Sequence, residues 1–227
     1  MCFPNPEAVL ASGGKLKLAN WDSHRDHACY GGQPYAHYEE YADKQDLTRV
    51  TVFADFDVSI RKGIISAIKW GYPSGAVRRN WKGLSHAFRS DGLVREIEAM
   101  RNEPACSALE IAKRLNRAVK GISTATTTKL AYFARLEAAE GPCLIYDSMV
   151  RRAISARCDP EFADLKRIIG SRSGDLLPGQ HATTYAAYLK AARAMAEGQN
   201  VQGDQIELFL FIGRENAAAL PPYPWLR

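Results

Sequence analysis

Residues 121–154 read GISTATTTKLAYFARLEAAEGPCLIYDSMVRRAI. The segment Thr126–Ala138 is typical of a helix with Lys129 in its first turn, and an extended return then leads from Gly141 to Asp147. The helix climbs roughly 14 Å beyond Lys129 at 1.5 Å per residue, and the return can cover roughly 20 Å at 3.3 Å per residue. We therefore expect the amine of Lys129 to meet the carboxylate of Asp147, which also caps the helix that follows.

The rest of the chain predicts an all-α fold, a compact helical bundle. From Asp55 the sequence becomes periodic. Isoleucines recur at helical spacing from Ile60 to Ile68, and Gly71-Tyr72-Pro73 is expected to end this helix. Further helices are expected at about Ser85–Asn102, Ser107–Val119, Ser148–Cys158, Pro160–Ile169, His181–Gly198 and Asp204–Gly213. The apolar run 143–146 is interpreted as an extended connector and not as part of a sheet.

Residues 1–50 show no sustained period of 3.6 or 2 and contain the pairs Gly13-Gly14 and Gly31-Gly32. They are interpreted as an irregular N-terminal arm, packed on a single helical domain over residues 51–227.

Composition excludes several classes of protein. A chain of 227 residues with 46% hydrophobic and 24% charged residues is not disordered. It has no run of roughly 20 apolar residues and no N-terminal signal, so a cytoplasmic protein without a membrane partner is expected. The five cysteines never form a CxxC pair, the histidines are not spaced as paired ligands and no phosphate-binding loop is present. We therefore expect no metal and no other cofactor.

The charge is unevenly distributed and favours a polyanion as the partner. Residues 1–60 carry a net charge of −4, whereas residues 61–227 carry +9. The segment Arg61–Arg95 contains eight basic residues and one acidic residue. We interpret Arg78, Arg79 and Lys82 as a loop between helices with Trp81 interleaved, suited to phosphate contacts and to filling the gap that a flipped base leaves.

The segment Thr126–Ile154 resembles the core of the helix-hairpin-helix DNA glycosylases, particularly the 8-oxoguanine DNA glycosylase branch. In that superfamily a lysine opens the second helix of the hairpin, and a catalytic aspartate begins the next helix after an apolar return. Lys129 matches the lysine, and the segment Asp147–Ala153 matches the segment that begins with the aspartate. The separation between the two positions matches as well. The resemblance departs at Ala125-Thr126-Thr127, where the family pattern has glycines, and neither a β-domain nor a four-cysteine iron–sulfur loop has a counterpart.

The resemblance implies a monomeric enzyme that flips a modified base out of double-stranded DNA and excises it. Asp147 is expected to stabilise the cationic sugar, and Lys129 to attack C1′ as a neutral amine and form a Schiff base that permits strand cleavage. If Lys129 stays charged, a monofunctional hydrolase that uses Asp147 alone is expected instead. The resemblance implies an oxidised purine such as 8-oxoguanine as the substrate, and a modified base in phage DNA is the alternative. Side chains flanking the pair are expected to contact DNA: Thr127, Thr128, Ser148, Arg151 and Arg152.

Two other functions are compatible with parts of the sequence. A non-catalytic helical module could grip DNA with the same hairpin and basic surface, and Lys129 would then contribute only charge. An N-terminal nucleophile at Cys2, as in class II glutamine amidotransferases, requires stacked sheets, and the chain lacks the strands for them.

Overall fold

The computed structural model describes residues 3–15, 46–73, 78–156, 159–169 and 180–212. Helices dominate these ranges: α1 (Pro6–Ala11), α4 (Arg49–Val58), α5 (Ile60–Gly71), α6 (Arg78–Arg89), α7 (Asp91–Asn102), α8 (Ala108–Ala118), α9 (Thr124–Phe133), α10 (Ser148–Ala156), the 3-10 helix η2 (Pro160–Phe162), α11 (Ala163–Ile168), α12 (His181–Gln199) and α13 (Gly203–Ile212). Two antiparallel ribbons accompany them: β1 (Gly13–Lys15) with β2 (Asp46–Thr48), and β3 (Glu137–Ala138) with β4 (Gly141–Pro142). The predicted all-α fold is confirmed.

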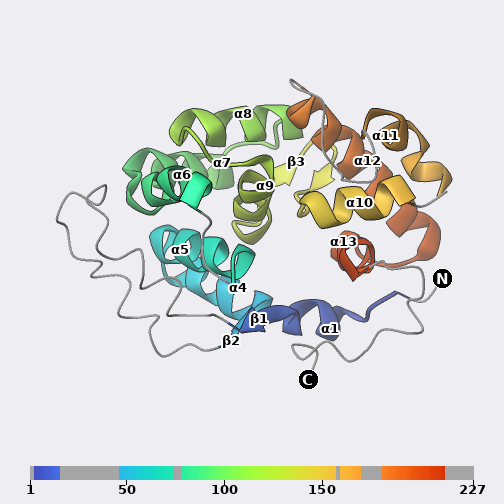
Figure 1. The fold of residues 1–227 in the computed structure, drawn as a ribbon, viewed down its shortest axis with the longest axis horizontal. Coiled ribbons are helices and arrows are strands. Elements are labelled where there is room, and N and C mark those ends of the chain that lie inside the picture. The colour runs from blue at the N-terminus through green and yellow to red at the C-terminus, as the bar shows by residue number, and fades with distance from the viewer. Residues whose placement is uncertain (1–2, 16–45, 74–77, 157–158, 170–179, 213–227) are drawn as a thin grey trace.

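Helix α9 lies near the middle of the molecule (Figure 1). Helices α4–α8 lie on one side of it, α10–α13 lie on the other, and α1 runs along one edge. A single apolar core joins both sides, since it includes Ile64 and Ile68 of α5, Leu130 of α9, Ile154 of α10 and Leu189 of α12. Because α9 and the N-terminus of α10 meet where the two sides join, a site built from them lies between the two sides.

Helices α8 and α9 form the helix-hairpin-helix element. Ser107 and Glu110 have the spacing of a capping box at the start of α8, where the Ser107 hydroxyl accepts a hydrogen bond from the Glu110 amide at 3.2 Å. The turn between the helices passes through Gly121, whose φ of 89° favours glycine. A Cβ atom on Gly83 of α6 would lie 2.1 Å from the Gly121 carbonyl oxygen, so the turn packs directly on the α6 backbone.

The bounds of α9 differ from the sequence prediction at both ends. The Ser123 hydroxyl accepts a hydrogen bond from the Thr126 amide at 3.2 Å, which starts the helix at Thr124 and leaves Lys129 in its interior, not its first turn. The helix ends at Phe133 and not near Ala138, because Arg135 adopts a left-handed φ of 52°. The chain then reverses through the β3–β4 ribbon, and residues 143–146 follow as the extended connector that the sequence predicts.

Two other helical segments differ from prediction. The sequence indicates one helix over Ser85–Asn102, but the Ser90 hydroxyl caps α7 through the Leu93 amide at 3.0 Å and divides the segment into α6 and α7. Helix α4 is not predicted at all. It begins after the Thr48 side chain, which accepts a hydrogen bond from the Thr51 amide, and it ends where Ser59 caps α5.

The described part of the N-terminal 50 residues contains regular elements as well as irregular chain. Helix α1 contacts α4 and α13, and Val9 packs against Leu208 and Ile212 of α13. In the β1–β2 ribbon a Cβ atom on Gly13 would lie 2.1 Å from the Leu47 carbonyl oxygen, so only glycine permits the two strands to pair this closely. The expected irregular arm therefore holds a helix and a ribbon, while residues 16–45 lie outside the described ranges.

Candidate active site

Lys129 and Asp147 are in contact. The Lys129 Nζ donates to Asp147 Oδ2 at 3.0 Å, and the two side chains are only 9% and 11% exposed. Lys129 projects from α9, and Asp147 is the residue immediately before α10. The structure thus brings together the two groups whose meeting the sequence predicts, although the helix between them is shorter than expected.

Asp147 uses its two carboxylate oxygens for different purposes. Oδ1 accepts hydrogen bonds from the backbone amides of Met149 at 2.9 Å and Val150 at 3.1 Å, which caps α10. Oδ2 faces Lys129. Burial by itself would raise the pKa of Asp147, but the Lys129 ammonium and the hydrogen bonds to the carboxylate outweigh it and lower that pKa. Asp147 is therefore held as an anion.

Hydrogen bonds at the preceding residues fix the register of the pair. The Tyr146 amide donates to Thr128 Oγ1 at 3.0 Å, and Arg151 Nη1 donates to the Tyr146 carbonyl at 3.1 Å. Thr128 precedes Lys129 and Tyr146 precedes Asp147, so the connector is fastened to α9 one residue before each member of the pair. Both polar groups of the Tyr146 backbone are satisfied in this way.

The end of α5 confines the Lys129 side chain. A Cβ atom on Gly71 would lie 2.8 Å from Lys129 Cδ and 3.1 Å from Cε, so the bare glycine leaves room for the stem of the lysine. From the sequence, Gly71 is predicted only to stop a helix. Its packing role depends on α5 and α9 lying side by side.

A second buried ion pair accompanies the first and was missed by sequence reasoning. Arg49 Nη2 of α4 lies 2.5 Å from Glu207 Oε2 of α13, with side chains 1% and 0% exposed. Arg49 Nη1 also donates to the hydroxyl of Tyr132 at 2.9 Å, and Tyr132 lies on α9 one turn after Lys129. We call Arg49, Tyr132 and Glu207 the Arg49 cluster.

Three of the side chains predicted to contact DNA are buried and bonded within the fold. Thr127 Oγ1 donates to Asn116 Oδ1 at 3.0 Å, Thr128 is used by Tyr146, and Arg151 is bound to the Tyr146 carbonyl. In this structure they maintain the fold and are largely buried, so their direct contact with DNA stays a prediction. Ser148 is half-buried and Arg152 is exposed on α10, so both remain at the surface beside Asp147.

The basic segment with Trp81 is helical. Arg78, Arg79, Trp81 and Lys82 lie in the first turns of α6 and not in the predicted loop. The side chains of residues 78–82 lie outside the described part of the structure.

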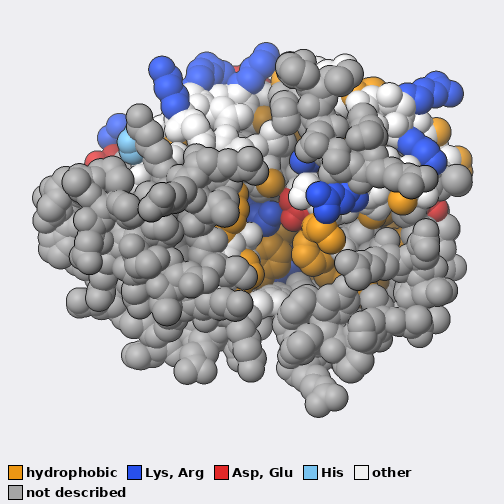
Figure 2. All heavy atoms as spheres, viewed as in Figure 1, with side chains coloured by type: hydrophobic (Ala, Val, Ile, Leu, Met, Phe, Trp, Pro, Cys, Tyr) orange, Lys and Arg blue, Asp and Glu red, His pale blue; other side chains and the backbone are white. Residues whose placement is uncertain are grey.

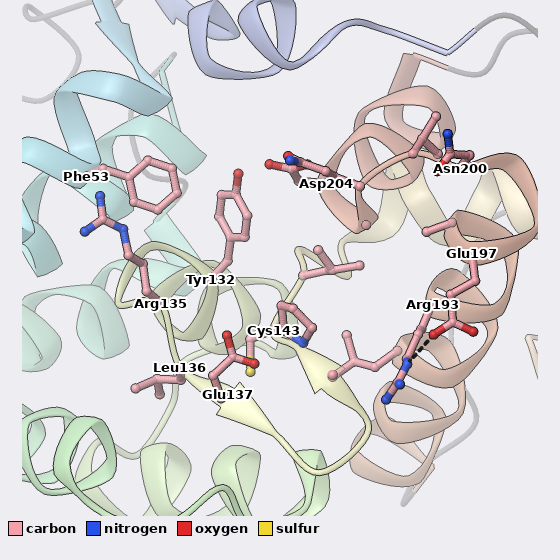
Figure 3. A pocket seen from close by; sticks show the side chains of 18 residues that line it. Phe53, Tyr132, Arg135, Leu136, Glu137, Cys143, Arg193, Glu197, Asn200 and Asp204 are labelled. Carbon is pink, nitrogen blue, oxygen red and sulfur yellow. Dashed lines mark hydrogen bonds and ion pairs between the residues drawn. The ribbon is translucent and has the colours of Figure 1, made fainter.

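The face of Figure 2 is hollowed near its centre, where basic, acidic and apolar side chains meet. A pocket of about 660 Å³ is lined by residues of α4, α9, the β3–β4 ribbon, α12 and α13. Its walls include Phe53, Tyr132 and Asp204, and the Asp204 carboxylate lies near the Tyr132 hydroxyl end in Figure 3. Neither Lys129 nor Asp147 lines it, so this pocket is distinct from the site of the pair.

Among the described residues, no group of three or more His, Cys, Asp or Glu side chains is placed to hold a metal ion. None of the helices in those ranges combines the length and the apolarity that crossing a bilayer requires.

Comparison with protein families identifies the family of the chain. The model of the family described as "Putative 8-oxoguanine DNA glycosylase OGG-like protein" matches residues 7–211. The chain belongs to this family. Membership in the OGG-like family supports a DNA glycosylase as the class of enzyme and DNA as the class of substrate. A search of curated proteins and a search of solved structures each gave no significant match.

Proposed function

We propose that this OGG-like protein excises a modified base from double-stranded DNA, with Lys129 and Asp147 as its catalytic residues. The 3.0 Å contact between two almost buried, oppositely charged side chains carries the proposal. A buried ion pair is costly unless geometry and further hydrogen bonds compensate it, so an ammonium and a carboxylate at the junction of two halves of the fold suit a reactive site.

The lowered pKa of Asp147 suits it to electrostatic stabilisation. As the glycosidic bond breaks, its electron pair leaves with the base and positive charge develops on the sugar. A carboxylate that stays ionised stabilises this charge, whereas a carboxyl that must first be protonated cannot. Asp147 is thus assigned to the cationic sugar and not to donating a proton to the departing base.

Lys129 is the nucleophile in this proposal. Its Nζ first loses a proton to water, then forms a bond to C1′ while the bond from C1′ to the base breaks, and the departing base takes up a proton from water. Transfer of a proton from Nζ to O4′ breaks the C1′–O4′ bond and gives a protonated Schiff base, and loss of a proton from C2′ to water then expels the 3′ phosphate by β-elimination. If water attacks C1′ in place of Lys129, the product is an intact strand with an abasic site.

The DNA surface is proposed to include the exposed face of α10 with Ser148 and Arg152, and the first turns of α6 with Arg78, Arg79, Trp81 and Lys82. The enzyme is proposed to act as a monomer, and its substrate is an oxidised purine such as 8-oxoguanine or a modified base in phage DNA. The electrostatic part of this binding should weaken as salt concentration rises, because phosphate contacts release counterions.

Trapping with borohydride tests the mechanism. Duplexes that each carry one candidate lesion are incubated with wild type, Lys129→Gln, Asp147→Asn and Lys190→Gln, which removes an exposed lysine from α12. We expect a covalent protein–DNA complex with wild type and Lys190→Gln and none with Lys129→Gln. Excision without a trapped complex would identify the monofunctional hydrolase. Binding without excision or cleavage of any lesion would identify the non-catalytic DNA-binding module.

A further inference from the structure

The Arg49 cluster spans the junction between the two sides of the fold. Arg49 begins α4, Glu207 lies in the middle of α13, and Tyr132 contributes the α9 hydroxyl to which Arg49 donates. The Arg49 guanidinium also lies over the rings of Trp70 and Tyr132, at 5.3 and 5.0 Å from their centroids. The Arg49 guanidinium therefore contacts groups on several sides. Its counter-ion is the carboxylate of Glu207, which comes from the opposite side of the fold.

The two members of this pair respond differently to burial. Burial raises the pKa of Glu207 to about 7 in spite of the attraction of Arg49. Burial also disfavours the Arg49 cation, but Glu207 and Tyr132 outweigh it and raise the pKa of Arg49. Within the described residues, Oε1 of Glu207 has no hydrogen-bond donor. Glu207 is thus the member of the pair that can change its charge near neutral pH.

Tyr132, whose hydroxyl accepts a hydrogen bond from Arg49 Nη1 at 2.9 Å, lies one turn after Lys129 on α9, so the Arg49 cluster adjoins the Lys129–Asp147 pair. Asp147 disfavours ionisation of Glu207, and Lys129 favours it. Such coupling is reciprocal, so the protonation state of Glu207 alters the potential at both members of the pair. This connection makes the Arg49 cluster part of the electrostatic environment of the reaction.

The titratable groups that interact electrostatically with Glu207 come from several elements. They are Arg49 from α4, Tyr132 and Lys129 from α9, Asp147 before α10 and Tyr188 from α12, while α1 packs on α13 through the apolar Val9. The two tyrosines stay neutral near pH 7 because burial raises their pKa values, to about 12 for Tyr132 and well above the ordinary value for Tyr188. Arg49 and Lys129 are the cations of the set.

We propose that Glu207 is a positioning residue for base excision, which balances the charge of Arg49 next to Lys129 and Asp147 and makes excision depend on its own ionisation. The inference rests on the proposed function. When Glu207 is ionised, the charge of Arg49 is compensated, and the negative charge of Asp147 favours a cationic sugar. When Glu207 is protonated, the uncompensated guanidinium opposes that cation, and excision slows.

Single-turnover excision between pH 5.5 and 8.5 tests the inference. We expect the wild-type rate to rise with a midpoint near the pKa of about 7 of Glu207. In Glu207→Gln this limb should be absent and the rate at high pH should fall by about tenfold. Glu207→Asp should keep a limb with a displaced midpoint, and Glu98→Gln, which removes an exposed carboxylate from α7, should behave as wild type. A Glu207→Gln profile with the wild-type midpoint and only a lower amplitude would overturn the inference.

Arg49→Met/Glu207→Gln guards against a variant that does not fold, because it removes both buried charges together. Its excision rate should also lack the rise near pH 7, and a retained rise would count against the inference.

A titration without DNA separates this inference from the proposed function. Carbon-13 NMR of labelled glutamate carboxyls is followed with pH in wild type, Asp147→Asn and Lys129→Gln, with Glu207→Gln for assignment. Loss of the negative neighbour in Asp147→Asn should lower the Glu207 midpoint, and loss of the positive neighbour in Lys129→Gln should raise it. If wild type excises no lesion, the proposed function fails, and the titration alone decides: shifts in these directions support the coupling, and an unchanged midpoint overturns it.

Discussion

The Tyr146 amide donates a hydrogen bond to the Thr128 hydroxyl at 3.0 Å, and this bond fixes the connector to α9 beside the Lys129–Asp147 pair. Both groups are buried. In Thr128→Val the Tyr146 amide stays buried but loses its acceptor. We therefore expect the free energy of unfolding, measured in urea, to fall by about 1–3 kcal/mol. Thr128→Ser should restore most of this, and Thr183→Val, at an exposed threonine of α12, should have little effect. Equal losses in the two valine variants would contradict the role assigned to Thr128.

Gly71 is expected to control the position of the Lys129 amine more than the stability of the fold. The Cβ of Gly71→Ala would meet Cδ and Cε of Lys129, which belong to a flexible side chain that can move aside. We expect a small change in the free energy of unfolding but a loss of about 10- to 100-fold in excision rate, because the amine leaves its attacking position.

The matched control for Gly71→Ala is Gly198→Ala, since a Cβ there meets nothing within 4 Å. It should gain up to about 1 kcal/mol of stability and keep full activity. Full activity in Gly71→Ala as well would show that its contact with Lys129 has no bearing on the reaction.

Asp147 combines a charge with a helix cap, and two substitutions separate these roles. Asparagine is a good N-cap residue, so Asp147→Asn should fold normally and keep its DNA affinity while losing excision. Asp147→Ala removes the cap as well, and we expect it to lower the free energy of unfolding by about a further 1 kcal/mol. Gel-shift, excision and urea measurements on both variants check this, and unchanged turnover in Asp147→Asn would exclude a catalytic role.

Sequence reasoning succeeded where the signal is local. The isoleucine spacing of α5 is visible in a short window, and the spacing between Lys129 and Asp147, together with the resemblance to the helix-hairpin-helix glycosylases, predicted their contact. The end of α9 was missed because Arg135 gives no sign in the sequence that it adopts a positive φ.

The Arg49 cluster could not be predicted for a different reason. Arg49 and Glu207 lie near opposite ends of the chain, and each by itself is typical of a solvated surface charge. Only tertiary packing makes them a pair. The burial of Thr127, Thr128 and Arg151 likewise depends on how α9, α10 and the connector pack together, and side chains of these types are more often exposed.

The dependence of stability on pH should show two opposed contributions from the buried carboxyls. The pKa of Asp147 is lowered from 3.8, so its stabilisation is present above pH 3.8 and is lost as the pH falls through the folded pKa. The pKa of Glu207 is raised from 4.5 to about 7, so the folded state binds more protons than the unfolded state between these values, and stability is lost as the pH rises from 4.5 to 7. The size of this loss is on the order of 3 kcal/mol.

Urea unfolding at pH values from 3 to 8 measures both contributions. Glu207→Gln also changes the contacts of Arg49, so slopes and not absolute values are compared. We expect the fall between pH 4.5 and 7 to disappear in Glu207→Gln and to persist in Glu98→Gln, whose carboxylate is exposed. The acid limb below pH 3.8 should persist in Glu207→Gln and become shallower in Asp147→Asn. A neutral-range slope that is the same in wild type and Glu207→Gln would mean that another group titrates there.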